Sequence, residues 1–196
     1  MAQPPFNPAT DPATAFLAKA SPSEILNYIR QFTNWRAKFP LTVEDFRWIA
    51  DRQSVALTTS VTSNNVTLKV PANQIALIFS LEGQIAFNLP GSETLAVTGL
   101  GNLSVADRIQ VKGMNCRVAL SNIDRKWKLF ETSNLPLSQI TKMCGGEPLT
   151  MNPPYVLADG EQMKTEFELT STESTIVGAS TDYGGIYKIL LVRAKS

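Results

Sequence analysis

The sequence predicts a mainly β protein: an antiparallel β-sandwich of jelly-roll-like form, preceded by an extended arm and two or three short α-helices. Two observations favour this fold class. After Arg52, roughly ten short strand-like segments recur at spacings near 8 to 12 residues, as in sandwiches and barrels. The pattern there lacks the long helical segments that alternate with strands in a parallel α/β sheet. Helix signals are confined to the first part of the chain.

The chain divides into three predicted parts. Residues 1–20 are expected to form an extended N-terminal arm with a short helix, residues 21–51 a helical segment, and residues 52–196 the β-sandwich domain. With 196 residues, of which 43% are hydrophobic and 18% charged, the chain is long enough to bury a core without disulfide or metal support.

The arm is predicted from its prolines. Pro4, Pro5 and Pro8 disfavour both a helix interior and a central strand. Asp11 followed by Pro12 has the pattern of an N-cap and a first helical residue, which starts a short helix through about residue 19.

The first ten residues of this arm contain too few apolar side chains for it to fold on itself. We therefore expect a neighbouring subunit or another partner to hold it, with Phe6, Phe16 and Leu17 as its apolar anchors.

Two further helix starts follow. Ser21 and Glu24 enclose Pro22 in a capping-box pattern, and the apolar residues after them, beginning with Ile25 and Ile29, recur at helical spacing. That helix is expected to stop before Pro40. The stretch 42–45 offers a third start, which predicts a short helix containing Phe46, Trp48 and Ile49.

The β domain is predicted from alternation and turn signals. Residues 63–65 (Ser-Asn-Asn) indicate a hairpin, and Glu82-Gly83 indicates a turn. In the stretch from 163 to 169, Met163, Thr165, Phe167 and Leu169 are expected to form the buried face. The strand-like segments are SVALTTSV, VTLKV, QIALIFSL, QIAFNL, ETLAVT, RIQVK, CRVALS, WKLFET, MKTEFELT, TIVGAS and IYKILLVRA.

Residue types that carry common chemistries are scarce. The chain has no histidine, which removes histidine-based triads and zinc sites, and no phosphate-cradling glycine motif occurs. We therefore expect no catalytic residue, no metal site and no cofactor. A net charge of +1 argues against a partner bound through bulk charge, so nucleic acid is not indicated.

The acidic candidates have simpler interpretations as surface residues. Glu166 and Glu168 would lie on the solvated face of a strand, and Glu44 and Asp45 would compensate a helix dipole. Asp159 before Gly160 is interpreted first as a turn residue.

The densest basic cluster surrounds Trp127. The stretch Arg125-Lys126-Trp127-Lys128 could bind nucleic acid or sugar through charge and stacking. Alternation in a strand instead favours an inward Trp127 with a charged outer face.

Cysteines and paired glycines add two open alternatives. Two free thiols at Cys116 and Cys144 are favoured over one disulfide between them. The Gly-Gly pairs at 145–146 and 184–185 are expected to make tight turns or bulges, with close approach of a neighbouring subunit's backbone as the alternative.

The N-terminus and the apolar runs of the sequence indicate whether the chain carries a secretory signal or a membrane span. The N-terminus has neither the basic nor the apolar region of a secretory signal, and no apolar run approaches the roughly 20 residues of a membrane span.

Three features together resemble the structural proteins of bacteriophage virions, of capsid, decoration or neck type. They are the proline-rich arm with capped helices, the stretch NPPYVLADGEQMKTEFELTSTESTIVGAS, and the terminal strand GGIYKILLVRA. The resemblance implies a non-catalytic role in a virion made in the host cytoplasm. Its implied partners are copies of itself and other virion proteins, contacted through the arm and the sheet edges.

Two rival functions remain. A lectin-like carbohydrate-binding β-sandwich, with a glycan partner, would need exposed aromatic residues, for which Tyr155, Tyr183 and Tyr187 are the candidates. An enzyme that uses carboxylates alone is the third hypothesis.

Overall fold

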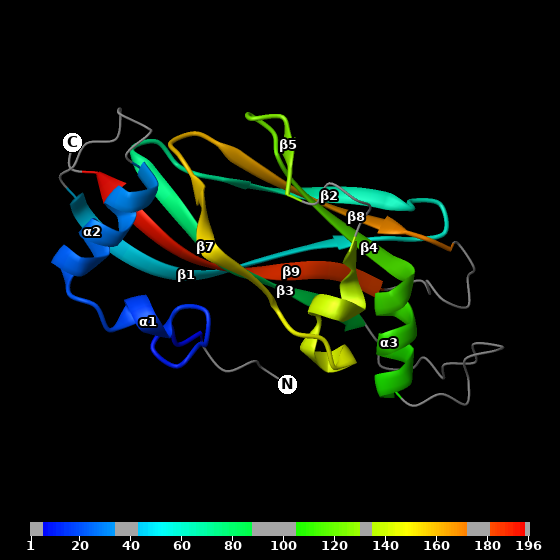
Figure 1. Cartoon of the computed structure of the whole chain (residues 1–196). Helices are drawn as coiled ribbons and strands as arrows, with labels where there is room; N and C mark the ends of the chain where they lie inside the picture. Colours follow the sequence, from blue (N-terminus) through cyan, green and yellow to red (C-terminus); the bar gives the residue numbers. More distant parts are fainter. Residues whose placement is uncertain (1–5, 34–42, 88–104, 130–134, 172–180, 195–196) are drawn as a thin grey trace.

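The computed structural model describes residues 6–33, 43–87, 105–129, 135–171 and 181–194. These residues form a mainly β protein with two antiparallel sheets and few helices (Figure 1). The elements are α1 (Ala15–Ala18), α2 (Pro22–Thr33), β1 (Val43–Ala56), β2 (Ser63–Lys69), β3 (Gln74–Phe87), α3 (Val105–Asn115), β4 (Cys116–Asn122), β5 (Trp127–Lys128), β6 (Leu135–Pro136), the 3-10 helices η1 (Leu137–Ile140) and η2 (Lys142–Cys144), β7 (Leu149–Leu157), β8 (Gln162–Leu169) and β9 (Thr181–Ala194).

The strands pair as a nested set. Sheet A has the order β1-β9-β3-β7, and sheet B has the order β2-β8-β4-β5, with β6 also paired to β4. The first strand thus pairs with the last, β2 with β8, β3 with β7, and β4 with β5. Successive pairs alternate between the two sheets: β1–β9 and β3–β7 lie in sheet A, whereas β2–β8 and β4–β5 lie in sheet B.

The facing sides of the two sheets share one apolar cluster. Met163, Phe167 and Leu169 of β8 are buried in it, together with residues of β3, β4 and β9. Thr165 is also buried, whereas the residues between them are half-buried or exposed. The prediction that the odd-numbered residues from 163 to 169 form the buried face is therefore confirmed.

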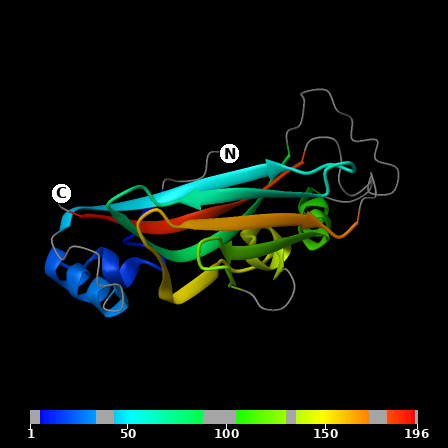
Figure 2. The same cartoon turned by 90° about the horizontal axis from the view of Figure 1, so that it is seen from above.

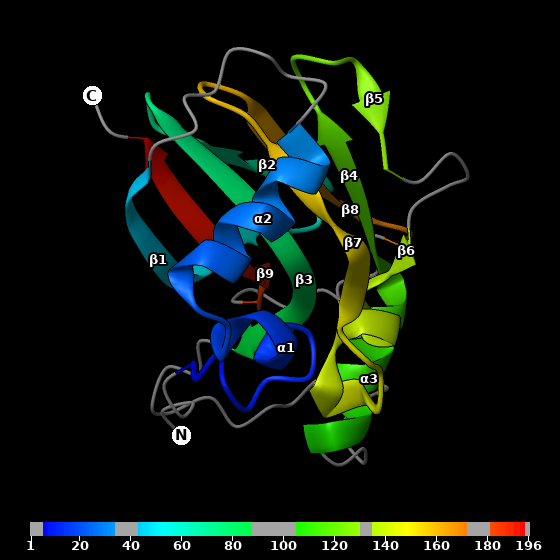
Figure 3. The same cartoon turned by 60° about the vertical axis from the view of Figure 1, so that its left-hand side comes forward.

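A second apolar cluster covers the other side of sheet A. Helices α1 and α2 lie across this side (Figure 3), and Leu17, Ile25 and Ile29 pack there against Leu77 and Phe79 of β3. The capping box that starts α2 is confirmed: the Ser21 backbone N–H donates to Glu24 Oε2 at 2.7 Å, and the Glu24 N–H donates to Ser21 Oγ at 3.4 Å. Hydrogen bonds from Ser21 lower the pKa of Glu24.

Sheet A therefore has an apolar cluster on each side. Strand β3 contributes to both clusters, and a β-bulge changes which of its residues face each side. Its register shifts between Ile78 and Ser80, so that Phe79 is the extra residue. Before the bulge, Ile75 and Leu77 face the helices; after it, Leu81 belongs to the cluster between the sheets. This change of phase turns Glu82 toward the helix-covered side.

The expected helix at residues 42–49 is wrong, because strand β1 begins at Val43. Phe46 and Trp48 alternate at period two and pack beside the helix cluster. The weak helix start is overridden by pairing with β9 along the whole strand. The β body therefore starts nine residues earlier than residue 52, as the range 43–56 of β1 shows.

Other boundaries also differ. The stretch RIQVK was predicted as a strand but lies in helix α3. Five residues are too few to distinguish the period of a helix from that of a strand. Glu82-Gly83 is no turn, since β3 continues through it. Residues 63–65 lie inside β2, which belongs to a different sheet from β1, so no hairpin joins those two strands. The stretches ETLAVT and TIVGAS lie outside the described residues.

Residues 6–20 form turns and helix α1 rather than an extended arm. They lie against the same side of sheet A as α2, while α3 lies at the opposite end of the sheets (Figures 1 and 2). Within the described ranges, no helix has the length and apolar character needed to cross a membrane.

Candidate functional site

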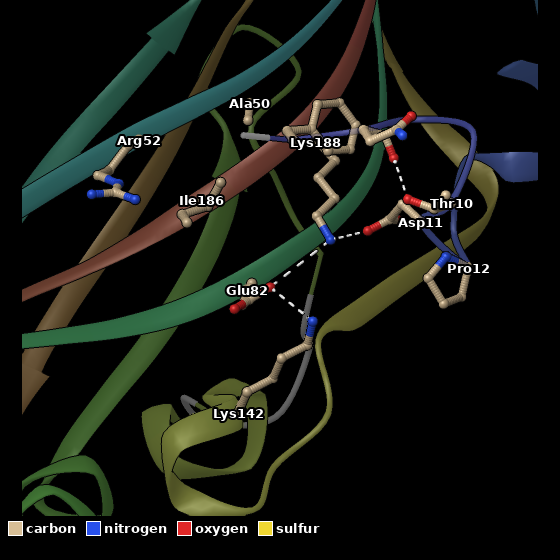
Figure 4. A pocket seen from close by; sticks show the side chains of 11 residues that line it. Thr10, Asp11, Pro12, Ala50, Arg52, Glu82, Lys142, Ile186 and Lys188 are labelled. Atoms are coloured by element: carbon tan, nitrogen blue, oxygen red, sulfur yellow. Dashed lines mark hydrogen bonds and ion pairs between the residues drawn. The ribbon is translucent and has the colours of Figure 1, made fainter. Parts of the chain in front are cut away.

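A pocket of about 790 Å³ opens on the helix-covered side of sheet A, beside the N-terminal segment (Figure 4). Lys188 of β9 lies at its centre and forms an ion pair with Asp11. The Lys188 Nζ also lies 3.9 Å from Oε2 of Glu82 on β3. Lys142 of η2 reaches the same Glu82 oxygen from the other side, at 3.5 Å.

The charged side chains of this pocket differ in how deeply they are buried. The side chains of Lys188, Asp11 and Glu82 are each 10% exposed, whereas that of Lys142 is 56% exposed. The Phe6 ring covers Lys188, with 5.8 Å between the ring centroid and Nζ. One buried ammonium group thus contacts two carboxylates, an arrangement that ties the N-terminal segment to sheet A.

The N-terminal segment is shaped to bring Asp11 to this position. The second oxygen of the Asp11 carboxylate accepts a hydrogen bond from the Ala13 N–H at 3.0 Å, and Thr14 Oγ1 donates to the Pro8 carbonyl at 2.7 Å. Asp11 was expected to cap a helix, and it does bond to the following turn, although α1 begins only at Ala15.

A second polar site is the aromatic ledge, which we define as Trp127, Tyr155 and Arg125. The rings of Trp127 and Tyr155 stack with centroids 5.6 Å apart and an interplanar angle of 26°. The Arg125 guanidinium lies 5.6 Å from the Tyr155 centroid. Trp127 is 48% exposed, so the expectation of an inward Trp127 is wrong. Strand β5 has two residues, both exposed, and too little length to bury this side chain.

Hydrogen bonds to Glu161, Val156 and Asn122 position the residues of the ledge. Arg125 donates to both carboxylate oxygens of Glu161, at 3.0 and 2.6 Å, and to the Val156 carbonyl at 2.8 Å. The buried Asn122 donates to the Tyr155 hydroxyl at 3.2 Å and accepts from the Arg125 backbone N–H at 2.9 Å. Hydrogen bonds within the chain therefore hold Arg125 and Tyr155 of the ledge in place.

The other tyrosine candidates are not on the surface. Tyr183 and Tyr187 are buried in β9, because this strand has buried faces on both sides. Burial raises the pKa of both phenols, and the Tyr187 hydroxyl is hydrogen-bonded to Thr165.

The predicted assembly anchors lie in different environments. Leu17 is buried in the chain's own helix cluster, and Phe6 lies over Lys188. Phe16 is 59% exposed, although its ring also contacts Tyr28 and Phe79. Whether a neighbouring subunit contacts these residues stays a prediction.

The described carboxylate candidates lie at the surface and apart from the pocket, and the side chain of Glu44 lies outside the described part of the structure. Glu166 is ion-paired with Lys164 at 2.9 Å, and Glu168 is exposed on the same strand. Asp45 is an exposed residue of β1, and Asp159 is exposed in the turn before Gly160. No three acidic or cysteine side chains of the described segments lie close enough to form a metal-binding group.

Both cysteines are free thiols, as favoured from the sequence. Burial raises the pKa of Cys116 to about 12 and also raises the pKa of the half-buried Cys144. Gly184 allows a close backbone approach within the chain itself, because a Cβ there would lie 2.3 Å from the Gln53 carbonyl oxygen of β1. Gly145 adopts a positive φ of 75° after η2.

The sequence reasoning missed Lys188 and Glu82. Glu82 is the one charged residue of β3, and Lys188 interrupts the apolar run from Ile186 to Val192 in β9; that contrast was the available signal. In a comparison with known proteins, no protein-family model and no curated protein sequence matches this chain.

Proposed function

We propose that this chain is a non-catalytic structural protein of a bacteriophage virion, a capsid or capsid-associated component with a jelly-roll-like sandwich. It assembles with copies of itself and with other virion proteins. The observation that carries the proposal is the nested strand order, β1-β9-β3-β7 facing β2-β8-β4-β5. Eight strands arranged as two such sheets are typical of jelly rolls, which occur in viral capsid and lectin domains.

Surface features support an assembly role. The edge strand β1 is 14 residues long, and β9 is its one strand partner among the described elements. Long unprotected edges pair readily with other chains. Phe16 adds an exposed apolar ring on helix α1. The buried Lys188 is ion-paired with both Asp11 and Glu82, which suits a structural tie between the N-terminal segment and sheet A better than a reactive site.

Measurement of mass in solution tests this proposal. We expect sedimentation velocity of the purified chain to reveal oligomers whose population grows with protein concentration, and electron microscopy to show regular rings or shells at high concentration. A strictly monomeric chain at every concentration would overturn the proposal.

The second candidate is a lectin-like carbohydrate-binding module, which the aromatic ledge favours. Sugars bind through stacking of their apolar faces on exposed aromatic rings, and Trp127 offers such a ring in a fixed position. Under this hypothesis a glycan array gives specific binding, which Trp127→Ala removes and Trp127→Phe partly keeps. Ile123→Ala, at an exposed residue near the ledge, is the matched control. No binding to the array would exclude the candidate.

A further inference from the structure

The outer edge of β1 is the surface from which we argue. The strand runs along β9 from Val43 to Ala56, and no described strand pairs with its other side. Figures 2 and 3 show β1 at the margin of sheet A, and Figure 3 shows α2 in front of the strands beside it. Such an edge presents a row of backbone donors and acceptors that can continue the sheet into another chain.

Charges of opposite sign lie at equal distances on the two sides of Ile49 in this edge strand. Asp45, Arg47, Ile49, Asp51 and Gln53 share one face of β1, because side chains alternate along a strand. Arg47 precedes Ile49 by two residues, and Asp51 follows it by two. Arg47 is exposed, and the β9 residue opposite it is the apolar Leu191, which offers no competing charge. The strand is thus complementary in charge to its own reverse.

We propose that two copies of this chain pair antiparallel through β1, about a twofold axis at Ile49. This inference rests on the proposed assembly function and names its partner as a second copy. In such a pair each Arg47 lies opposite Asp51 of the other copy, twice over, and Ile49 meets Ile49 on the axis. Asp45 lies opposite Gln53, whose amide nitrogen donates one hydrogen bond to Asp51 of its own chain, at 2.8 Å, and has a second N–H for the Asp45 carboxylate.

The opposite face of β1 fits the same register. Phe46 lies opposite Arg52 of the second copy, a pair suited to cation–π contact, and Trp48 lies opposite Ala50, a small residue that leaves room for the indole. On the Ile49 face there is also space: a pocket of about 310 Å³ beside β1 is lined in part by Ile49, Asp51 and Gln53.

Neighbouring twofold registers are worse. An axis at Trp48 places Asp45 opposite Asp51, and axes at Arg47 or Asp51 place that residue against its own copy, so like charges face each other. An axis at Ala50 loses both ion pairs. The Ile49 axis alone among these five gives two opposite-charge pairs and no like-charge pair, and it continues the sheet over the nine residues from 45 to 53.

Charge reversal tests this register. We expect Arg47→Asp and Asp51→Arg each to weaken dimerisation by about tenfold or more in sedimentation equilibrium, because each replaces two attractive pairs by two repulsive ones. An equimolar mixture of the two variants should form a heterodimer, since its pairs are again Asp opposite Arg. The double variant Arg47→Asp/Asp51→Arg should dimerise like the native chain.

Controls and alternative outcomes are distinct. Lys19→Asp and Asp159→Arg reverse exposed charges elsewhere and should leave the dimer unchanged. Native-like circular dichroism of each variant excludes misfolding, and the double variant serves where a single one misfolds. Assembly that is indifferent to both single reversals, or that neither the mixture nor the double variant restores, overturns the β1 pairing and leaves the proposed assembly function standing. A native chain that stays monomeric overturns both.

Discussion

Phe167→Ala is expected to lower the free energy of unfolding by about 3–5 kcal/mol, as large-to-small changes at fully buried aromatic positions do. Phe167 is 1% exposed and lies in the cluster between the sheets, opposite Val118 of β4. The cavity left by the ring would lie where β8 joins β2 and β4, so the loss acts on the centre of sheet B.

Urea unfolding followed by tryptophan fluorescence measures this effect. Glu168→Ala is the matched control, because the next residue of the same strand points to solvent and its loss should change stability by less than about 0.5 kcal/mol. Phe167→Leu, with a smaller loss of volume, should fall between the two and remains measurable if the alanine variant does not fold. A loss below about 1 kcal/mol for Phe167→Ala would show that this side chain does not support the core.

Local patterns in the sequence were sufficient for the elements whose environment is simple. β8 has one buried and one solvated side, so alternation from Met163 to Leu169 identified both its structure and its buried face. Likewise, Ser21 and Glu24 define the start of α2 through bonds between near neighbours. In both cases the deciding interactions depend on residue order alone.

The misassigned elements depend on contacts distant in sequence. β1 is a strand because β9, more than a hundred residues later, pairs with it, and β3 continues through Gly83 because that residue pairs with Gly185 of β9. The site follows the same rule. Asp11, Glu82 and Lys188 come from three separate segments. The bulge at Phe79 turns Glu82 toward Lys188, and the apolar sequence around Phe79 gives no signal that predicts a bulge.

Lys188→Met is expected to lower the free energy of unfolding by about 3 kcal/mol, because it leaves the buried Asp11 carboxylate without its cationic partner and Glu82 with only the exposed Lys142. Lys188 supplies the ammonium group that both Asp11 and Glu82 contact, and all three side chains are 10% exposed. The variant should also release the segment around Asp11 from sheet A, which faster hydrogen exchange at the Ala13 and Thr14 amides would detect.

Matched variants separate this role from a general effect of charge. Lys142→Ala removes the exposed lysine that contacts the same Glu82, and it should cost at most about 1 kcal/mol, as exposed ion pairs do. Adding Asp11→Asn and Glu82→Gln to Lys188→Met should recover part of the lost stability, because no unpaired carboxylate then remains. Equal losses for Lys142→Ala and Lys188→Met, or no recovery in the triple variant, would contradict a buried ion cluster that fastens the N-terminal segment to the sheet.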